Sequence, residues 1–348
     1  MFVMNKPLLI TMGDAAGIGP EIIAKAFRDA PAEMAGCMVV GDVATLRRAS
    51  ALMAAPLAWP VVQLDSMAAH SVPPGAIPVL QKCELQTPIE PGLVSGLAGQ
   101  AAADCVVWAA RAVLAGEAAG MVTAPLHKEA LAAAGGWAAN FPGHTEMLQA
   151  EAAVFLGKPI SEVPVRMMLA SPEIKTVLVS IHLALRDAIE AVTFDGVLQT
   201  LRITHKALLA SLGRAPRMAV AGLNPHAGEG GRFGREEQAT IAPAIAAARA
   251  EGLDVTGPFA PDTVFMRARN TAQKPGEFDV VVAMYHDQGL IPVKYLGLEQ
   301  GVNVTLGLPL VRTSPDHGTA FDIAGTGRAD ASSLIAAVQM ARQLAALK

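Results

Sequence analysis

Short apolar runs alternate with longer segments of helical periodicity along most of the chain. The runs that predict strands are Leu8–Met12, Met38–Gly41, Met121–Ala124, Met218–Gly222, Asp279–Met284 and Val302–Leu306. The segments that predict helices are Gly19–Phe27, Thr45–Met53, Ser95–Leu114, Ala239–Ala250 and Ser332–Leu347. Because this alternation is typical of βα units, the pattern predicts an α/β protein with a mainly parallel sheet covered by helices.

The middle of the chain departs from this pattern. The apolar runs Val165–Ala170 and Lys175–Ile181 are separated only by Ser171, Pro172 and Glu173, which predicts an antiparallel hairpin. We find no internal repeat and no low-complexity linker. We therefore expect any boundary between domains to lie within a compact structure, without a flexible connecting segment.

Composition narrows the class of protein. The chain has 348 residues, enough for two domains, with 52% hydrophobic residues and a net charge of -4. It has no basic excess that would follow a phosphate backbone, so we expect no nucleic-acid partner. Cys37, Cys83 and Cys105 show no paired spacing, which predicts no disulfide framework and favours a reducing cytoplasm. We find no signal peptide and no apolar run that approaches the length needed to span a bilayer, so we expect a soluble protein without a membrane partner.

Histidines gather in segments rich in Gly, Pro, Asp and Asn. His182, His226 and His286 each follow a predicted strand. Ligands of βα sheets collect beyond the carboxyl ends of the strands, so all three imidazoles could project into one cleft. Three imidazoles suit a divalent metal such as zinc. The alternative is that each is a separate loop histidine that caps backbone groups.

A glycine-rich segment, Gly13 to Glu21, joins a predicted strand to a predicted helix. Its order of glycines is wrong for the dinucleotide-binding fingerprint. We expect Gly17 and Gly19 to permit a tight turn with positive φ, and Pro20 to stand in the first helical turn. A purely structural strand-to-helix turn would also explain the segment.

Lys294, Asn303 and Arg312 stand near apolar strand positions in a chain that is poor in charge. Two cations and an amide donor in one cleft would suit a phosphate monoester, whereas ordinary surface charges are the alternative. Asp262, and Asp287 beside His286, are candidates for hydrogen bonds to metal ligands or to a substrate hydroxyl.

Several long segments, taken together, resemble one family. They are Thr11–Glu21, Pro142–Glu146, Gly222–Gly231, Ala283–Gly289, Gly301–Pro309 and Arg312–Gly325. In these segments the chain resembles the 4-hydroxythreonine-4-phosphate dehydrogenase family of vitamin B6 synthesis, which includes 4-phospho-threonate and 4-phospho-erythronate dehydrogenases. The resemblance runs from about Leu8 to the last helix. Ala15 stands where the family usually has Pro, which we expect to alter only the stiffness of the turn.

The resemblance implies a set of site residues. The implied metal ligands are His182, His226 and His286, for one divalent ion of zinc, magnesium or cobalt. The implied substrate-binding residues are His144, Thr145, Lys294, Asn303 and Arg312. The implied catalytic residues are Asp262 and Lys294, although a metal-bound hydroxide is an alternative to Asp262 as general base. The implied contacts to NAD, or to NADP, come from His317, Gly318 and Asp322.

The resemblance also implies an architecture. It predicts two α/β domains like those of isocitrate and isopropylmalate dehydrogenases, with the active site in the cleft between them. We expect one domain to comprise residues 1–126 and 305–348 and the other residues 127–304. The family is homodimeric, so we expect a second copy of the chain to complete each active site at the subunit interface.

The implied reaction is NAD-dependent oxidation, with decarboxylation, of 4-phosphooxy-L-threonine to 3-amino-2-oxopropyl phosphate. Oxidation of 4-phospho-D-threonate or 4-phospho-D-erythronate in sugar-acid catabolism is the alternative. Leu126–Lys128 and Gly228–Gly231 look closer to the vitamin B6 enzyme. Relatives that oxidise a diol from terephthalate breakdown fit less well, because the phosphate set is present here. A metal-containing binding protein without catalysis is a further alternative.

Overall fold

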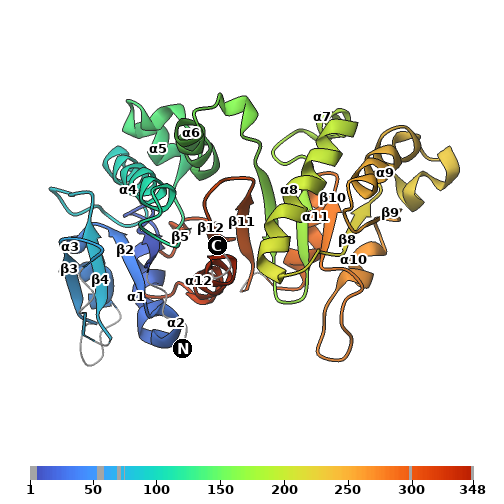
Figure 1. Ribbon diagram of the computed structural model, residues 1–348. Coiled ribbons are helices and arrows are strands. Elements are labelled where there is room, and N and C mark those ends of the chain that lie inside the picture. Colours follow the sequence, from blue (N-terminus) through green and yellow to red (C-terminus); the bar gives the residue numbers. More distant parts are fainter. Residues whose placement is uncertain (1–5, 53–58, 69–71, 74, 298–299, 346–348) are drawn as a thin grey trace. The chain divides into compact units, whose positions relative to one another are not determined.

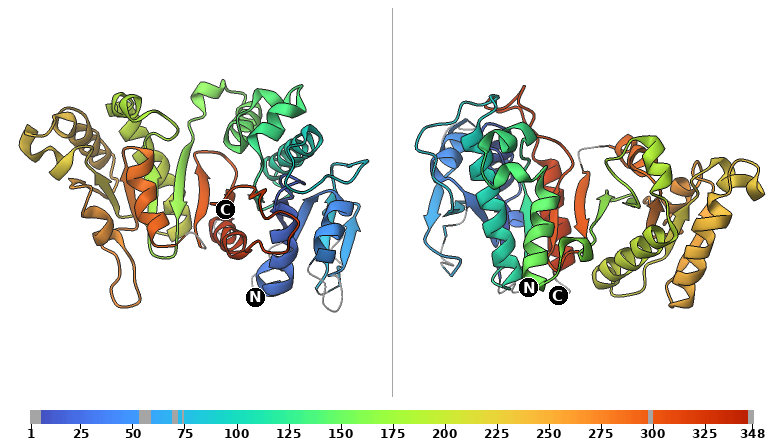
Figure 2. Two further views of the ribbon diagram at one scale, coloured as in Figure 1. Left: turned by 180° about the vertical axis from the view of Figure 1, so that it is seen from behind. Right: turned by 90° about the horizontal axis from the view of Figure 1, so that it is seen from above.

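The computed structural model describes residues 6–52, 59–68, 72–73, 75–297 and 300–345. The chain forms two compact units (Figures 1 and 2). Among the described residues, unit 1 comprises those up to Pro164 and Leu308–Ala345, and unit 2 comprises those within Val165–Gly307. Each unit combines sheet and helices, which confirms the predicted α/β class.

Unit 1 is built around a parallel sheet. Its strands, in spatial order, are β3 (Val61–Leu64), β4 (Ile77–Gln81), β2 (Cys37–Gly41), β1 (Leu8–Thr11), β5 (Gly120–Thr123) and β12 (Arg312–Pro315). Its helices are α1 (Gly19–Asp29), α2 (Pro31–Met34), α3 (Val43–Leu52), α4 (Gly96–Leu114), α5 (Lys128–Ala134), η1 (Ala138–Asn140), α6 (His144–Leu156), η2 (Ile160–Glu162) and α12 (Ser332–Ala345). Strand β1 is fully buried and pairs in parallel with β2 and β5. Helix α4 packs against these strands, as does α12.

Unit 2 is mixed. Its strands, in spatial order, are β11 (Val302–Leu306), β6 (Arg166–Ala170), β7 (Lys175–Leu178), β10 (Val280–Ala283), β8 (Met218–Ala221) and β9 (Val255–Phe259). Its helices are α7 (Leu185–Glu190), α8 (Phe194–Leu212), η3 (Pro225–Gly231), η4 (Glu237–Ile241), α9 (Ala242–Ala250), α10 (Val264–Ala268) and α11 (His286–Tyr295). The strands β7, β10, β8 and β9 run parallel, whereas β6 is antiparallel to both β11 and β7.

The elements predicted from periodicity all form, with shifted ends. The predicted hairpin is confirmed, because β6 and β7 are antiparallel and the Ser171 amide donates to the Ile174 carbonyl at 2.8 Å. Met53 and Leu347, at the ends of two predicted helices, lie outside the described residues. Helix α8 and strand β12 were not predicted from periodicity.

Residues 127–164 belong to unit 1, and not to the second domain as predicted. Glycines in α4 explain this, because they allow α5 to approach closely. A Cβ added at Gly99 would lie 2.1 Å from the Ala130 carbonyl oxygen, and one at Gly96 would lie 2.4 Å from that of Ala133. This contact fixes the segment after β5 to the helix that covers the sheet of unit 1.

Helix α4 corrects the expectation that no segment is long enough to span a bilayer. It has 19 residues and meets the length and hydropathy of a membrane span. However, 67% of its apolar window is buried inside the protein. Such burial is typical of the core helix of a globular unit.

Asp279, before β10, anchors the N-terminal side of two neighbouring strands in unit 2. Its carboxylate accepts hydrogen bonds at 2.8 Å from both guanidinium Nη atoms of Arg214 and at 2.7 Å from the Arg217 amide. Burial would raise the pKa of Asp279, but the hydrogen bonds from Arg214 and Arg217 hold that pKa well below its ordinary value. The carboxyl side chain is 12% exposed.

Asp279→Asn is therefore expected to lower the free energy of unfolding by about 1–3 kcal/mol. The Asp279 carboxylate stabilises the fold fully at pH values above the carboxyl pKa in the unfolded chain, which is about 4. This stabilisation is lost as the pH falls toward the lower carboxyl pKa in the folded protein. Urea unfolding should thus give the same difference at pH 7 and pH 5. Glu277→Gln is the control, because the pair of Glu277 with Arg267 is more than 40% exposed on both sides and should contribute little to stability. Equal losses in the two variants would contradict the prediction.

Candidate active site

The carboxyl ends of β7 and β10 bring two of the predicted metal ligands together. Leu178 pairs with Ala283 in the parallel ladder. The Ser180 hydroxyl donates to the Met284 carbonyl at 3.0 Å and so joins the two chains beyond the strands. His182 and His286 follow, and their ring centroids are 5.8 Å apart.

The pair of His182 and His286 fits a shared divalent ion. With metal–nitrogen bonds of about 2.0–2.1 Å, two imidazoles on one tetrahedral ion have ring centroids roughly 5 Å apart. His286 Nδ1 lies 2.7 Å from Asp287 Oδ1. Such a carboxylate fixes the ring orientation and leaves Nε2 to face an ion, which is how metal-binding histidines are usually held.

His226 stands apart from this pair. It lies in η3 after β8, and its ring centroid is 6.2 Å from that of Phe233. Among the residues that the structure describes, no three His, Cys, Asp or Glu side chains form a group that could hold a metal. His226, Ala227 and Glu229 have positive φ of 54°, 52° and 39°, which costs about 1–3 kcal/mol at each residue. Such strain is typical of loops whose conformation serves binding or catalysis.

Two positioning residues around these histidines carry no signal in the sequence. The buried Glu237 carboxylate accepts hydrogen bonds from the amides of Leu223 and Asn224, at 2.8 and 2.7 Å, and so fixes the loop before His226. Gln288 accepts from the Met284 amide at 2.7 Å and donates to the Gly222 carbonyl at 2.8 Å. Gln288 therefore ties the end of β10 to the end of β8.

The remaining predicted residues of unit 2 lie around the same sheet. Asp262 is exposed and lies just before α10. Lys294 is exposed near the end of α11, and Asn303 is partly buried on β11. Their proposed contacts with a substrate stay predictions.

Arg312 is the principal charged group of unit 1. It is 4% exposed on β12, and its Nε and Nη2 donate to the Thr123 hydroxyl of β5 at 3.1 and 2.7 Å. Burial lowers the pKa of Arg312 to about 10, while the Glu146 carboxylate acts to raise it. At neutral pH the guanidinium is therefore still charged, and it forms a fixed cation beside Thr123 at the end of β5.

His144 and Thr145 begin α6, and His144 lies within electrostatic range of Arg312. Burial lowers the pKa of His144 well below its ordinary value, and the charge of Arg312 lowers it further. His144 is consequently neutral at pH 7. Its Nε2 is buried without a hydrogen-bond partner among the described residues, so it is available to a bound molecule. The structure thus brings together the predicted substrate residues His144 and Arg312.

Sequence reasoning did not single out Asp14 or assign a role to His127, which lie close enough to interact. Burial raises the pKa of Asp14, whereas the Ala16 amide and His127 act to lower it. The His127 ring stacks on Phe321 with centroids 4.4 Å apart. Phe321 belongs to the segment His317–Gly325, the predicted cofactor loop, in which His317 is partly buried and Gly318 and Asp322 are exposed.

The glycine-rich turn after β1 works differently from the prediction. Positive φ occurs at Gly13, at 74°, and not at Gly17 or Gly19. Gly17 instead allows close approach of the predicted cofactor loop, because an added Cβ would lie 2.9 Å from Thr319 Cβ. Pro20 stands in the first turn of α1, as predicted.

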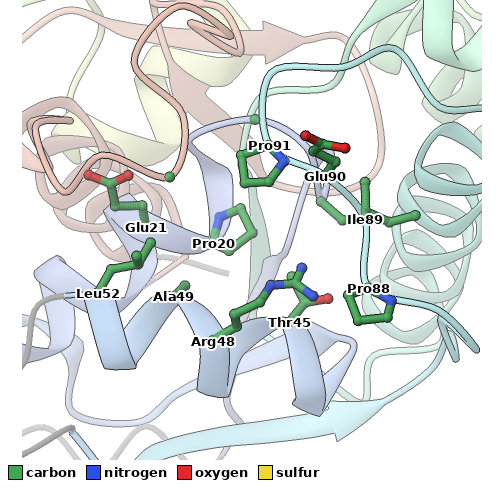
Figure 3. Close-up of a pocket in the computed structure, with 13 residues that line it drawn as sticks. Pro20, Glu21, Thr45, Arg48, Ala49, Leu52, Pro88, Ile89, Glu90 and Pro91 are labelled. Atoms are coloured by element: carbon green, nitrogen blue, oxygen red, sulfur yellow. The ribbon is translucent and has the colours of Figure 1, made fainter.

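Unit 1 also contains a pocket of about 360 Å³ beyond the ends of β1, β2 and β4 (Figure 3). This volume lies within the roughly 300–1,000 Å³ that is usual for small-molecule sites. Its lining comes from the start of α1, from α3, from the segment after β4 and from Gly325 of the cofactor loop. The carboxyl ends of parallel strands are where open α/β sheets bind ligands.

Comparisons with known proteins identify relatives across the whole chain. The family model described as "Pyridoxal phosphate biosynthetic protein PdxA" matches residues 33–341. A 4-hydroxythreonine-4-phosphate dehydrogenase of Beijerinckia indica is 51% identical over 99% of this chain and 96% of its own length. A D-threonate 4-phosphate dehydrogenase of Pectobacterium atrosepticum is 43% identical over 98% of this chain and all of its own. A crystal structure of 4-hydroxythreonine-4-phosphate dehydrogenase from Klebsiella pneumoniae has a TM-score of 0.84 and 41% identity, covering 98% and 99% of the two chains.

These matches extend over nearly the entire chain, and the family model covers most of it. They confirm the family resemblance drawn from the sequence motifs. The chain belongs to the PdxA family of pyridoxal phosphate biosynthetic proteins.

Proposed function

We propose that this chain is a cytoplasmic, nicotinamide-dependent dehydrogenase that converts 4-phosphooxy-L-threonine to 3-amino-2-oxopropyl phosphate and carbon dioxide. The observation that carries the proposal is the buried, charged Arg312 beside the neutral His144. A fixed guanidinium is suited to bind a phosphate monoester through paired N–H donors. The 51% identity to a relative named 4-hydroxythreonine-4-phosphate dehydrogenase supports the choice of substrate.

The residues of unit 1 would bind and orient the substrate. Arg312 neutralises the phosphate, and the Thr123 hydroxyl holds its guanidinium in place. The unpartnered Nε2 of neutral His144 can accept a hydrogen bond from a hydroxyl or ammonium group of the substrate. Binding the phosphate away from the reacting carbon contributes proximity and orientation. Thr145, Lys294 and Asn303 are further proposed substrate contacts.

The proposed chemistry needs two groups from outside the chain. A nicotinamide supplies the hydride acceptor, and a divalent ion supplies Lewis-acid polarisation of the substrate oxygen. The histidine pair of unit 2 fits such an ion by spacing and donor type, and we propose His226 as its third protein ligand. Asp262 is the proposed general base, and Lys294 is proposed to assist catalysis. We further propose a homodimer whose second copy completes the site.

We propose that the pocket of unit 1 holds the adenosine half of the nicotinamide coenzyme, with His317, Gly318 and Asp322 in contact with it. Apolar side chains of Pro20, Leu52 and Ile89 offer walls for a flat ring (Figure 3). Glu21 lines this pocket, and its Oε2 atom is buried and has no hydrogen-bond partner among the described residues. A ribose hydroxyl would supply that missing donor.

A specific observation keeps a second substrate under consideration. The relative of 43% identity is named D-threonate 4-phosphate dehydrogenase, and that substrate carries a hydroxyl where the amino acid carries an ammonium group.

The decisive experiment follows reduction of NAD or NADP with 4-phosphooxy-L-threonine, 4-phospho-D-threonate and 4-phospho-D-erythronate, each with and without a metal chelator. We expect the largest kcat/KM with the amino substrate and loss of turnover after chelation. A larger kcat/KM with 4-phospho-D-threonate would establish the alternative. No turnover with any of the three would favour a binding protein without catalysis. Full activity in chelated buffer would remove the metal from the proposal.

A further inference from the structure

The pocket of unit 1 carries charges of both signs at different places. Glu21 enters it from α1, Arg48 enters from α3, and Glu90 lies at the segment after β4 (Figure 3). Glu21 is 2% exposed, and its Oε1 lies 3.6 Å from the Lys25 ammonium, which offsets its charge. Glu90 is exposed to solvent. Among the described residues, Arg48 forms no ion pair with either of these carboxylates.

Arg48 is half-buried, and no hydrogen bond or ion pair of its side chain occurs among the described residues. Figure 3 shows its guanidinium directed between Pro20, Thr45 and Pro88. The other arginines of unit 1 that lie near carboxylates form pairs, such as Arg111 with Glu151 at 2.7 Å. A guanidinium that faces a pocket without a partner is a ready site for a phosphate group.

The carboxylate of Asp42, which follows β2, already accepts hydrogen bonds from other groups of the protein. In many dinucleotide-binding sheets such an acid binds the adenosine ribose and disfavours a 2′-phosphate. Here Asp42 Oδ2 accepts from the amide and the hydroxyl of Thr45, both at 2.8 Å, and Oδ1 accepts from Gln81 at 3.0 Å. Asp42 therefore caps α3 and is not directed at a ligand. Arg48, six residues further along the chain in α3, lines the pocket.

We propose that Arg48 binds the 2′-phosphate of a coenzyme adenosine, so that this chain accepts NADP and does not depend on NAD alone. The proposal rests on the assignment of the pocket to the coenzyme under the proposed function. It deepens that assignment by naming the residue that reads the additional phosphate. Arg48 is then a specificity-determining residue and takes no part in the chemical step.

The test compares Arg48→Gln with Arg47→Gln in the full-length protein. Arg47 is the matched control, because it is adjacent on α3 but exposed and outside the pocket lining. Calorimetry would measure binding of 2′,5′-ADP and of 5′-ADP, which carry the adenosine end with and without the additional phosphate. For Arg48→Gln we expect the affinity for 2′,5′-ADP to fall by about 10–100-fold, which is the usual effect of losing a charge-assisted hydrogen bond. The affinity for 5′-ADP should change less than about twofold, and Arg47→Gln should leave both affinities unchanged.

Each other outcome overturns the role of Arg48. Equal weakening for the two nucleotides would mean that Arg48 binds the shared diphosphate. No change for either would place the 2′-phosphate elsewhere. A coincident melting temperature for the two variants excludes misfolding as the cause. Because nucleotide binding needs no substrate, these outcomes are independent of whether the phosphorylated amino acid is oxidised, which alone decides the proposed function.

A separate observation concerns two cysteines that the sequence leaves unpaired. Cys83 follows β4 and Cys105 lies in α4, and their Sγ atoms are 3.4 Å apart. Both are free thiols. A disulfide has an S–S length of about 2.05 Å, so a small rotation of the side chains brings the atoms to bonding distance. Cys83 is partly exposed, whereas Cys105 is fully buried, so an oxidant can reach only Cys83 directly.

We infer that Cys83 and Cys105 form an intramolecular disulfide when the protein meets a small disulfide such as oxidised glutathione. The Cys83 thiolate attacks one sulfur of the oxidant, forming a mixed disulfide and releasing one glutathione thiolate. The Cys105 thiolate then attacks Cys83 Sγ and releases the second thiolate. Two protein thiols are oxidised, one glutathione disulfide is reduced, and the two protons pass to the released thiolates.

The test incubates the native protein with oxidised glutathione and maps its peptides by mass spectrometry. We expect loss of two hydrogens and a cross-link between the peptides of Cys83 and Cys105. In Cys105→Ser the second step is blocked, so glutathione should remain attached at Cys83. Cys37→Ser should behave as the unsubstituted protein does, because Cys37 is buried and the close sulfur contact is between Cys83 and Cys105. Stable glutathione on Cys83 of the unsubstituted protein, or no reaction there, would refute the inference.

Discussion

Replacing Arg312 by methionine is expected to lower kcat/KM for the phosphorylated substrate by a factor on the order of 10³, because removing one partner of a buried charge pair costs about 2–5 kcal/mol. Methionine fills much of the volume of the arginine stem but carries no charge. The phosphate would then enter a buried site without a counter-charge. Most of the loss should appear in KM, since the interaction forms in the bound substrate as well as in the transition state. Steady-state kinetics over a wide substrate range would measure both parameters.

Two further variants separate charge from position. Arg312→Lys keeps the charge but loses the forked donors, so we expect a loss between that of methionine and the unsubstituted enzyme. Thr123→Val removes the hydroxyl that accepts from Nε and Nη2. It should lower kcat/KM by about tenfold, because the guanidinium is then held less firmly.

The pKa of His144, measured by NMR, gives an independent test of the charge at position 312. Burial is its main cause of depression and Arg312 the second, so Arg312→Met should raise that pKa partway toward the ordinary value. Unchanged KM in Arg312→Met would show that the phosphate binds elsewhere.

Replacing His286 by alanine is expected to abolish metal-dependent turnover, with a loss of at least about 10³-fold in kcat. The reason is that a site with three protein ligands retains its ion poorly after losing one. Zinc and cobalt content after gel filtration would be measured by elemental analysis alongside activity. A variant that keeps both its metal and its activity would exclude His286 as a ligand.

Asp287→Asn is the matched variant for this experiment. It retains the imidazole of His286 but weakens the acceptor that lies 2.7 Å from Nδ1. Loss of such a carboxylate typically lowers metal affinity or activity by about 10–100-fold. We therefore expect Asp287→Asn to be partially active and to recover with added metal, whereas His286→Ala should not recover. Equal loss in both variants, without recovery, would indicate that Asp287 has a direct role.

Periodicity predicted eight of the twelve strands in the described part of the chain, because each of these is an apolar run with turn residues near its ends, but it did not predict β3, β4 or β9. It failed at β12, whose residues Arg312–Pro315 are polar or turn-forming and yet buried. The strand forms there because parallel pairing with β5 satisfies its backbone and Thr123 satisfies the guanidinium. The domain boundary failed for a related reason. The glycine contacts between α4 and α5 depend on backbone approach, which side-chain pattern does not encode.

Part of the candidate site could be predicted because its histidines directly follow predicted strands. It correctly anticipated that His182 and His286 lie together, because β7 and β10 are adjacent and parallel. It could not anticipate His226, although β8 is the next strand, because Glu237 and Phe233 determine where that loop runs. The cysteine pair could not be predicted from the sequence either, since Cys83 and Cys105 meet only through the packing of α4 on the sheet of unit 1. Long-range side-chain contacts of this kind leave no local pattern.

His226 has a left-handed backbone conformation. This conformation affects which residues would be selected at position 226 if variants were chosen for thermal stability alone. Glycine or asparagine would occupy a φ of 54° more readily than histidine does. Heat-tolerant variants chosen without regard to catalysis should therefore tend to replace this imidazole, and those chosen while catalysis is required should retain it. At position 226, the backbone conformation therefore favours one kind of amino acid, whereas the proposed role of the side chain favours histidine.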